Sequence, residues 1–289
     1  MVKMSNRWPV VGALAVAGLL VGCKEDNLTQ ITLAITSETK VPAEITDLEL
    51  VVTNGLGSVV HNVTYDVTKQ SFFPTTLALI PDGSDSLTRP VEVTVRATSG
   101  GKLIVLRKAI VSYAEERNLL LPLSLRMACF SIDSCKPNET CAGGECVPAA
   151  IDSATLLEFK PQFVFASELE GGCFNEDTCL STVTPTPVDK DTCEFIIPAG
   201  GEKNANVAIE WWTAQGRMIN LEGEDEQEGW KRVSEKKGIL AKGVCRLLHE
   251  DQNLNPNAAA RAFVSTSCPP KRGNQPYCGG GVGVALKAP

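Results

Sequence analysis

Cysteine is the most reactive residue type in this chain, and its 11 copies are placed unevenly along the 289 residues. Cys23 stands alone near the N-terminus, four cysteines follow with the spacing Cys-x5-Cys-x5-Cys-x4-Cys, and six more are spread over the last part of the chain. In order, these ten are Cys129, Cys135, Cys141, Cys146, Cys173, Cys179, Cys193, Cys245, Cys268 and Cys278. Thiols either pair as disulfides or bind a soft metal as thiolates.

The pattern favours disulfides over metal. Structural zinc sites typically use Cys-x2-Cys pairs, but the sequence has none, and His61 and His249 are its only imidazoles. Setting Cys23 aside leaves ten of the 11 cysteines, an even number that can pair completely. We expect the four and the six to pair within their own groups, with no metal and no other cofactor. Four cysteines allow three pairings, so the connectivity stays open.

The sequence lacks the main catalytic templates, namely the Gly-x-Ser-x-Gly elbow, the His-Glu-x-x-His pair, the Walker loop and Gly-x-Gly-x-x-Gly. Two carboxylates can cleave a glycosidic bond, and Glu210, Glu222, residues 224–226 and Glu228 supply several. Because most of these are nearly consecutive, a solvated loop is the better interpretation. We therefore expect a non-catalytic protein, and a carbohydrate-active enzyme using these clustered carboxylates is one alternative.

Three of the four tryptophans lie in one stretch, as Trp211, Trp212 and Trp230. In a strand, alternate residues face opposite sides, so Trp212 shares a face with Glu210 and not with Trp211. If that face is exposed, an indole beside a carboxylate offers a sugar ring a stacking plane and an acceptor. A glycan-binding protein using Trp212 and Glu210 is the second alternative, and a strand covered on both faces is the structural explanation.

The N-terminus combines Lys3 and Arg7 with an apolar segment over residues 10–21, of about the 7–15 residues expected for a signal peptide. It ends in Leu20-Val21-Gly22-Cys23, which resembles the bacterial lipobox. The resemblance implies a lipoprotein signal peptide over residues 1–22, lipidation of Cys23 including palmitate, and anchoring in the bacterial outer membrane at its periplasmic face or at the cell surface. Residues 23–30 would form the tether. Cys23-Lys24-Glu25-Asp26 also resembles the surface-export signal of some Gram-negative lineages.

The net charge is −7 and the basic residues form no stripe, which argues against a nucleic-acid partner. The expected partners are the membrane, through the lipid on Cys23, and an envelope glycan or another surface protein. We expect a structural or recognition role.

Residues 31–127 alternate apolar and polar side chains, as strands with one buried face do. The expected strands are 31–36, 48–53, 58–67, 76–80, 91–98, 103–111 and 118–126, separated by turn formers such as Asn54-Gly55 and Ser99-Gly100-Gly101. His61 falls on the inward side with Val59, Val63 and Tyr65, and we expect a buried or rim histidine. The segment resembles immunoglobulin-like and fibronectin-type modules in architecture, although the Cys, Trp, Cys signature is absent.

Residues 128–149 hold four cysteines and few aliphatic residues, so disulfides must replace a hydrophobic core there. This module resembles the short cysteine-rich, loosely EGF-like modules of bacterial surface lipoproteins, and we interpret it as a stiff joint. Residues 150–289 form a disulfide-stapled, mostly-β domain. Its expected strands are 161–166, 193–197, 205–212, 217–221, 244–249, 261–267 and 281–287. The predicted fold is mainly β, with an antiparallel sandwich, the joint and this C-terminal domain.

Overall fold

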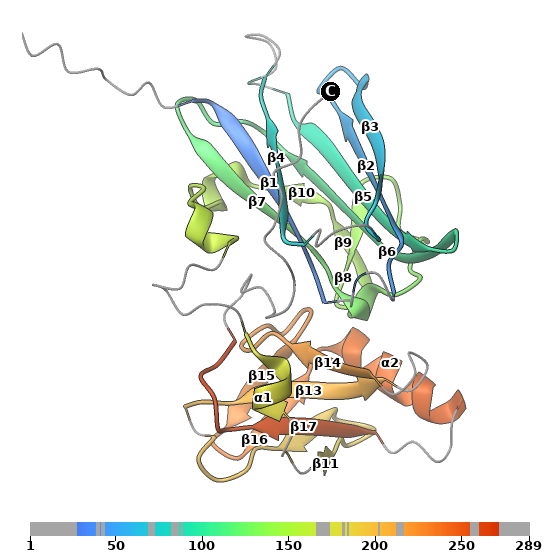
Figure 1. The fold of residues 1–289 in the computed structure, drawn as a ribbon, viewed down its shortest axis with the longest axis vertical. Coiled ribbons are helices and arrows are strands. Elements are labelled where there is room, and N and C mark those ends of the chain that lie inside the picture. Colours follow the sequence, from blue (N-terminus) through green and yellow to red (C-terminus); the bar gives the residue numbers. More distant parts are fainter. Residues whose placement is uncertain are drawn as a thin grey trace, which may run out of the picture.

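A computed structural model describes the chain over residues 28–38, 41, 44–68, 73–81, 87, 89–165, 174–180, 183, 185–201, 203–211, 217–254 and 260–271. Within these ranges the protein is mainly β and disulfide-rich, as predicted. The structure comprises an N-terminal sandwich, a small cysteine-rich module and a C-terminal pair of sheets, and the chain returns to the sandwich after the module before it forms the C-terminal sheets (Figure 1). None of the helices in the described ranges is long and apolar enough to span a membrane.

Two sheets form the sandwich. The three-stranded sheet has the order β4-β1-β7, and the five-stranded sheet has the order β10-β6-β5-β2-β3. Their bounds are β1 (Gln30–Ser37), β2 (Asp47–Thr53), β3 (Val59–Asp66), β4 (Thr75–Leu79), β5 (Val91–Ser99), β6 (Lys102–Val111), β7 (Asn118–Leu125) and β10 (Ala150–Ile151). Most neighbours are antiparallel, as expected, but β1 pairs in parallel with β7, and β10 with β6.

Alternation explains the core of the sandwich. On β5, Val91, Val93 and Val95 are at most 3% exposed, while the residues between them are half-buried. The buried faces of the two sheets pack against each other in one continuous cluster. The seven strands expected in this segment are all present, with bounds that differ by one or two residues.

Strand β1 departs from the expected pattern because both of its faces are buried. Thr32 and Ala34, expected on the solvent side, are 4% and 3% exposed. The chain that follows β10 covers this outer face, where Val164 packs with Ala34 and Leu120. The Phe159 amide donates to the Asn118 carbonyl at 2.7 Å. Residues 156–165 therefore form a strap across the three-stranded sheet.

His61 lies on β3, the edge strand of the five-stranded sheet, and is buried as expected. Its Nε2 lies 3.2 Å from the Tyr65 hydroxyl oxygen. The expectation that Val59 faces inward is wrong, because its side chain is 58% exposed. The pairing of β2 with β3 shifts register beside Val59, and this bulge breaks the alternation before His61.

The cysteine-rich module consists of a 3-10 turn, η2 (Met127–Cys129), and a hairpin of β8 (Glu139–Ala142) and β9 (Glu145–Pro148). The hairpin is attached to β6 of the sandwich. The Lys108 amide donates to Thr140 Oγ1 at 2.9 Å, and Lys108 Nζ donates to the Pro137 carbonyl at 2.5 Å. The module is therefore fixed to the sandwich by hydrogen bonds as well as by the chain.

The C-terminal part contains one sheet of order β11-β17-β13-β14 and another of order β12-β16-β15. Their bounds are β11 (Pro185–Pro187), β12 (Glu194–Ile196), β13 (Asn206–Trp211), β14 (Arg217–Leu221), β15 (Trp230–Ser234), β16 (Lys237–Leu240) and β17 (Arg261–Ser265). Two helices are added, α1 (Glu176–Leu180) and α2 (Lys242–Leu254). Phe195 and Trp230 pack edge to face at 5.8 Å between ring centres in the smaller sheet.

Two expected strands of this part are wrong. Residues 244–249 belong to helix α2, because Val244, Cys245 and Leu248 recur at helical spacing and form its buried face. In place of the strand at 161–166, Pro161–Phe163 forms a 3-10 turn, which suits a proline at the first position. Strands β11, β15 and β16 were not expected. The strand expected at 281–287 lies outside the described residues.

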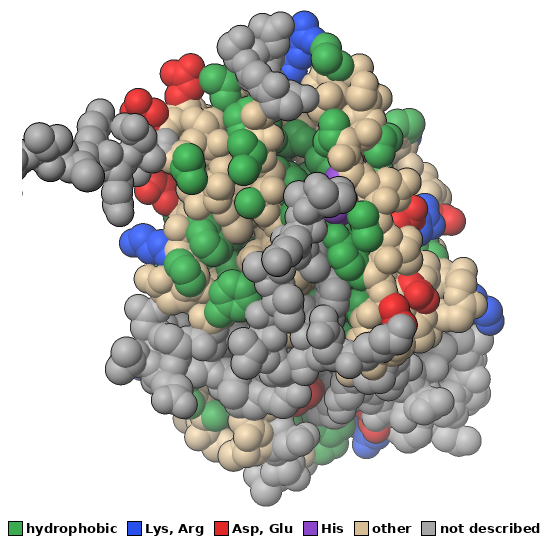
Figure 2. All heavy atoms as spheres, turned by 45° about the horizontal axis from the view of Figure 1, so that its top comes forward, with side chains coloured by type: hydrophobic (Ala, Val, Ile, Leu, Met, Phe, Trp, Pro, Cys, Tyr) green, Lys and Arg blue, Asp and Glu red, His purple; other side chains and the backbone are tan. Residues whose placement is uncertain are grey.

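The two ends of the sandwich have different neighbours. The C-terminal part lies at the end where β1 and β7 finish, and the chain enters at the opposite end, where β1 begins (Figure 1). Figure 2, in which the entry end is turned forward, shows several hydrophobic side chains on its surface. The molecule is therefore elongated, and the C-terminal pair of sheets lies far from the point of chain entry.

Candidate functional site

The disulfides confirm the predicted grouping for every cysteine that the structure describes. Within the module, Cys129 pairs with Cys141 and Cys135 with Cys146. Within the C-terminal part, Cys193 pairs with Cys245 and Cys179 with Cys268. The last two bridges close 52 and 89 residues of chain, respectively, and link the residue before β12 to α2 and the segment after β17 to α1. Cys23, Cys173 and Cys278 lie outside the described residues.

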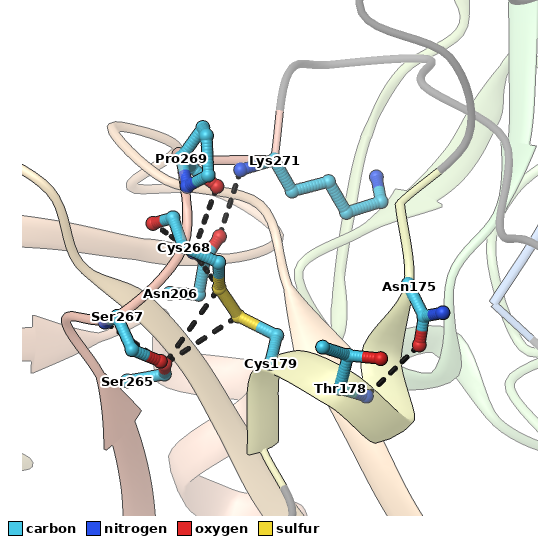
Figure 3. Close-up of a disulfide and its surroundings, with 9 residues drawn as sticks. All are labelled: Asn175, Thr178, Cys179, Asn206, Ser265, Ser267, Cys268, Pro269 and Lys271. Atoms are coloured by element: carbon cyan, nitrogen blue, oxygen red, sulfur yellow. Dashed lines mark hydrogen bonds between the residues drawn. A yellow bond between two sulfur atoms is a disulfide. The ribbon is translucent and has the colours of Figure 1, made fainter.

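The surroundings of the Cys179–Cys268 bridge direct the chain that follows it (Figure 3). Asn206, 2% exposed, donates from its side-chain amide to the Pro269 carbonyl at 3.0 Å. Its Oδ1 accepts from the Lys271 amide at 2.7 Å. Figure 3 shows the Lys271 side chain extending away from the bridge. The buried asparagine thus sets the path that carries Lys271 toward the sandwich.

Lys271 belongs to a group of six charged side chains between the sandwich and the C-terminal part, here named the interface ion cluster. Its members are Glu38, Arg107, Arg126, Glu222, Glu228 and Lys271. Glu38, Arg107 and Arg126 come from the sandwich, while Glu222 and Glu228 flank the β14–β15 loop. Three carboxylates face three cations, so the cluster as a whole is neutral.

Arg126 is the centre of the interface ion cluster. Its Nη1 lies 2.9 Å from Glu38 Oε1 and 3.1 Å from Glu222 Oε1, and its Nε lies 4.0 Å from Glu228 Oε2. Arg107 pairs with Glu228, and Lys271 pairs with Glu222. Since Glu38 and Glu222 belong to different parts of the molecule, Arg126 bridges the two parts through charge-assisted hydrogen bonds.

Burial and neighbouring charges shift the pKa values in opposite directions here. Burial raises the pKa of Glu38 above its ordinary value, although Arg126 and the Met127 amide, which donates to Glu38 Oε2 at 2.9 Å, act to lower it. Burial lowers the pKa of Lys271, opposed by Glu222. For Arg126, burial acts to lower the pKa, but the surrounding carboxylates raise it above its usual range. Arg126 therefore stays charged.

Glycines let the cysteine-rich module approach the C-terminal part at backbone distance. At Gly143, where φ is +58°, a side chain would collide with the Gln227 carbonyl oxygen. At Gly243, the second residue of α2, a side chain would collide with the Gly143 carbonyl oxygen. The turn between β8 and β9 thus packs on both the β14–β15 loop and the start of α2. These contacts fit the interpretation of the module as a stiff joint.

The proposed sugar site is described only in part. Glu210 Oε2 accepts a hydrogen bond from Arg261 Nη2 at 3.2 Å across the β13–β17 pair. The carboxylate that was expected to accept from a sugar is therefore engaged by a neighbouring cation. Trp212 lies outside the described residues, so the glycan-binding alternative stays a prediction.

The clustered carboxylates divide into two kinds. The exposed Glu224 and Glu226 carboxylates form surface ion pairs with Arg232 and Lys231, as a solvated loop predicts. Glu222 differs, since it is 5% exposed and belongs to the interface ion cluster. The β14–β15 loop turns back on itself, with the Trp230 amide donating to the Glu222 carbonyl at 3.0 Å. Glu222 and Glu228 therefore contact the sandwich through Arg126, whereas Glu224 and Glu226 lie at the surface.

Sequence reasoning missed Glu38, Arg107, Arg126 and Lys271. One signal was present for Arg126, which ends the apolar run of β7 directly before the buried Met127. A charge at such a position needs a partner, but the sequence does not say which one. Within the described ranges, no group of three or more metal-binding side chains has the proximity to hold an ion.

Comparison of the chain with protein-family models, curated proteins and solved structures found no match. Its function is therefore inferred from its own residues.

Proposed function

We propose that this chain is a lipid-anchored protein of the bacterial outer membrane with a structural or recognition role, carrying an immunoglobulin-like sandwich as a spacer. The observation that carries the proposal is the sequence Leu20-Val21-Gly22-Cys23 behind a basic and apolar N-terminal segment. Lipidation of Cys23 would add several acyl chains, and two or more chains hold a protein at a membrane durably where one does not.

The disulfides support export of the chain. Four cysteine pairs have Cα–Cα distances of 5.3 to 5.9 Å, within the range of native bridges. Such bridges persist in the periplasm and at the cell surface and are rare in the reducing cytosol.

The elongated shape supports a spacer role. Strand β6 has 10 residues, which at about 3.3 Å per residue spans about 33 Å. The sandwich therefore separates its entry end from the C-terminal part by roughly this distance. The stiff joint and the interface ion cluster keep the C-terminal part at a fixed orientation, so a partner would meet it at a defined height.

The test is a Cys23→Ser substitution in the native host, with Asn27→Ser in the tether as the matched control. We expect labelled palmitate to be incorporated into the parent and the control but not into Cys23→Ser, which should move from the membrane fraction to the soluble fraction. A Cys23→Ser protein that still partitions wholly with outer membranes would refute the anchor.

The side of the membrane needs a separate measurement. Protease added to intact cells should degrade the parent if it is displayed at the surface and spare it if it faces the periplasm. Replacing Lys24, Glu25 and Asp26 with serine tests the export resemblance, because it leaves Cys23 in place. Loss of protease access without loss of membrane association would assign surface display to these three residues.

A further inference from the structure

Five of the nine exposed large apolar side chains in the described ranges lie together at the entry end of the sandwich. Leu28, Leu56 and Ile80 are 70%, 70% and 68% exposed, and Val59 and Val60 are 58% and 52% exposed. Single exposed apolar residues are ordinary, but a gathered set marks a surface that meets a membrane or another protein. The set of five is here named the apolar end.

Strand register places these residues at the same end. Gln30, the first residue of β1, pairs with Asn118, and the next residue pairs with Leu79, so Ile80 lies beside the entering chain. In the other sheet, Thr53 pairs with Val59 beside the turn that carries Leu56. Residues 112–117 connect the two sheets at this end, because they join β6 to β7.

The opposite end of the sandwich is occupied. Arg126, which follows β7, and Glu38, which follows β1, both belong to the interface ion cluster there. The apolar end therefore points away from the C-terminal part, along the long axis of the molecule (Figure 1). Figure 2 shows hydrophobic side chains on the same surface.

The chain outside the structure indicates what covers this end. Cys23 precedes Leu28 by only five residues, which reach at most about 17 Å when extended. A lipid on Cys23 would hold the apolar end within that distance of the bilayer, whereas the C-terminal part would remain at the far side of the sandwich. This step rests on the proposed lipidation.

The charges near the apolar end indicate whether contact with a membrane would be electrostatic or hydrophobic. Arg89 and Arg117 lie on loops of this end together with Glu115 and Glu116, so basic and acidic side chains balance. A polybasic patch, which attachment to anionic headgroups would need, is not formed by these four residues. The contact would therefore depend on aliphatic side chains entering the interfacial region of the bilayer.

We propose that the apolar end docks on the bilayer surface, with Leu28, Leu56 and Ile80 inserted at the interface, so that the lipid and the sandwich hold the protein upright together. The contact is a second attachment point beside the lipid. With this contact the sandwich stands on the membrane as an oriented stalk.

The test uses the full acylated protein in vesicles of phosphatidylethanolamine and phosphatidylglycerol with brominated acyl chains. Leu56→Trp places a fluorescent probe at the apolar end, and Val233→Trp places one on an exposed position of β15 in the C-terminal part. The emission of the parent protein is subtracted from that of each variant, which removes the contribution of the native tryptophans. We expect the Leu56→Trp emission to shift to the blue and to be mostly quenched by bromine, and the Val233→Trp emission to be unaffected.

The outcomes separate this proposal from the anchor. Protein that floats with the vesicles while Leu56→Trp stays unquenched would overturn the docking and leave the anchor standing. Protein that does not float would refute the anchor itself. In Cys23→Ser protein without vesicles, concentration-dependent self-association that Leu56→Glu abolishes would show that a second copy covers this end, and would also overturn the proposal.

Discussion

Replacing Arg126 with methionine should strongly destabilise the protein, because it removes the cation that Glu38 and Glu222 share. Arg126, Glu38 and Glu222 are 8%, 5% and 5% exposed, so the remaining carboxylates cannot be hydrated. Glu222 would keep Lys271 and Glu38 would keep the Met127 amide, but both carboxylates would lose the guanidinium that they share. Breaking a buried ion pair from one side typically costs about 3–5 kcal/mol. For a protein of this size, about 2–4 °C per kcal/mol gives a fall in Tm of about 6–20 °C.

The assay is thermal unfolding of oxidised protein, with Lys231→Met as the control. Lys231 Nζ lies 2.7 Å from Glu226 Oε2, but both side chains are about half exposed or more, so loss of this solvent-screened pair should change the Tm little. Because burial raises the pKa of Glu38, the Arg126→Met deficit should shrink as the pH falls and Glu38 takes up a proton. Adding Glu38→Met should restore part of the Tm. If Arg126→Met and Lys231→Met unfold within about 2 °C of each other, the interface ion cluster does not stabilise the fold.

Two further predictions concern a histidine and the two cysteines outside the described residues. Burial lowers the pKa of His61 below 6.5, so on acidification the unfolded chain binds the proton before the folded chain does, and stability falls as the pH drops below about 6.5. The Tm of His61→Gln should therefore fall less between about pH 7.5 and 5.5 than the Tm of the parent. Equal falls in Tm would contradict this. Because the other eight cysteines beyond Cys23 are paired, Cys173 and Cys278 should form the fifth bridge. Mass mapping of unreduced peptides should find it, and a thiol that alkylates without reductant would disprove it.

The sandwich could be predicted from the sequence because most of its strands bury one face and expose the other. The alternation of Val91, Val93 and Val95 with polar residues is a local signal, and local signals survive in the sequence. The double burial of β1 could not be predicted in this way, because the strap that covers Ala34 comes from Val164, far along the chain.

The C-terminal part was harder to predict because its segments are short and its signals conflict. Val244, Cys245 and Leu248 fit a helix better than a strand, but Gly243 beside them weakened the helical signal. The interface ion cluster was missed for a different reason. Its six charges come from five separate stretches of the chain, and only the folded chain brings them together.

The parallel pairing of β1 with β7 also determines how the sandwich bears tension. A pull on the chain before Gln30 acts at the entry end of β1, and a load that the C-terminal part transmits through the Arg126–Glu222 pair acts next to Leu125, at the opposite end of β7. Because the two strands run side by side from Gln30–Asn118 to Ser37–Leu125, opposed forces on them act along the strands and across the hydrogen bonds. The whole ladder is then sheared at once rather than opened one bond at a time. The strand nearest the chain entry is thus held by a ladder of hydrogen bonds that tension loads in shear.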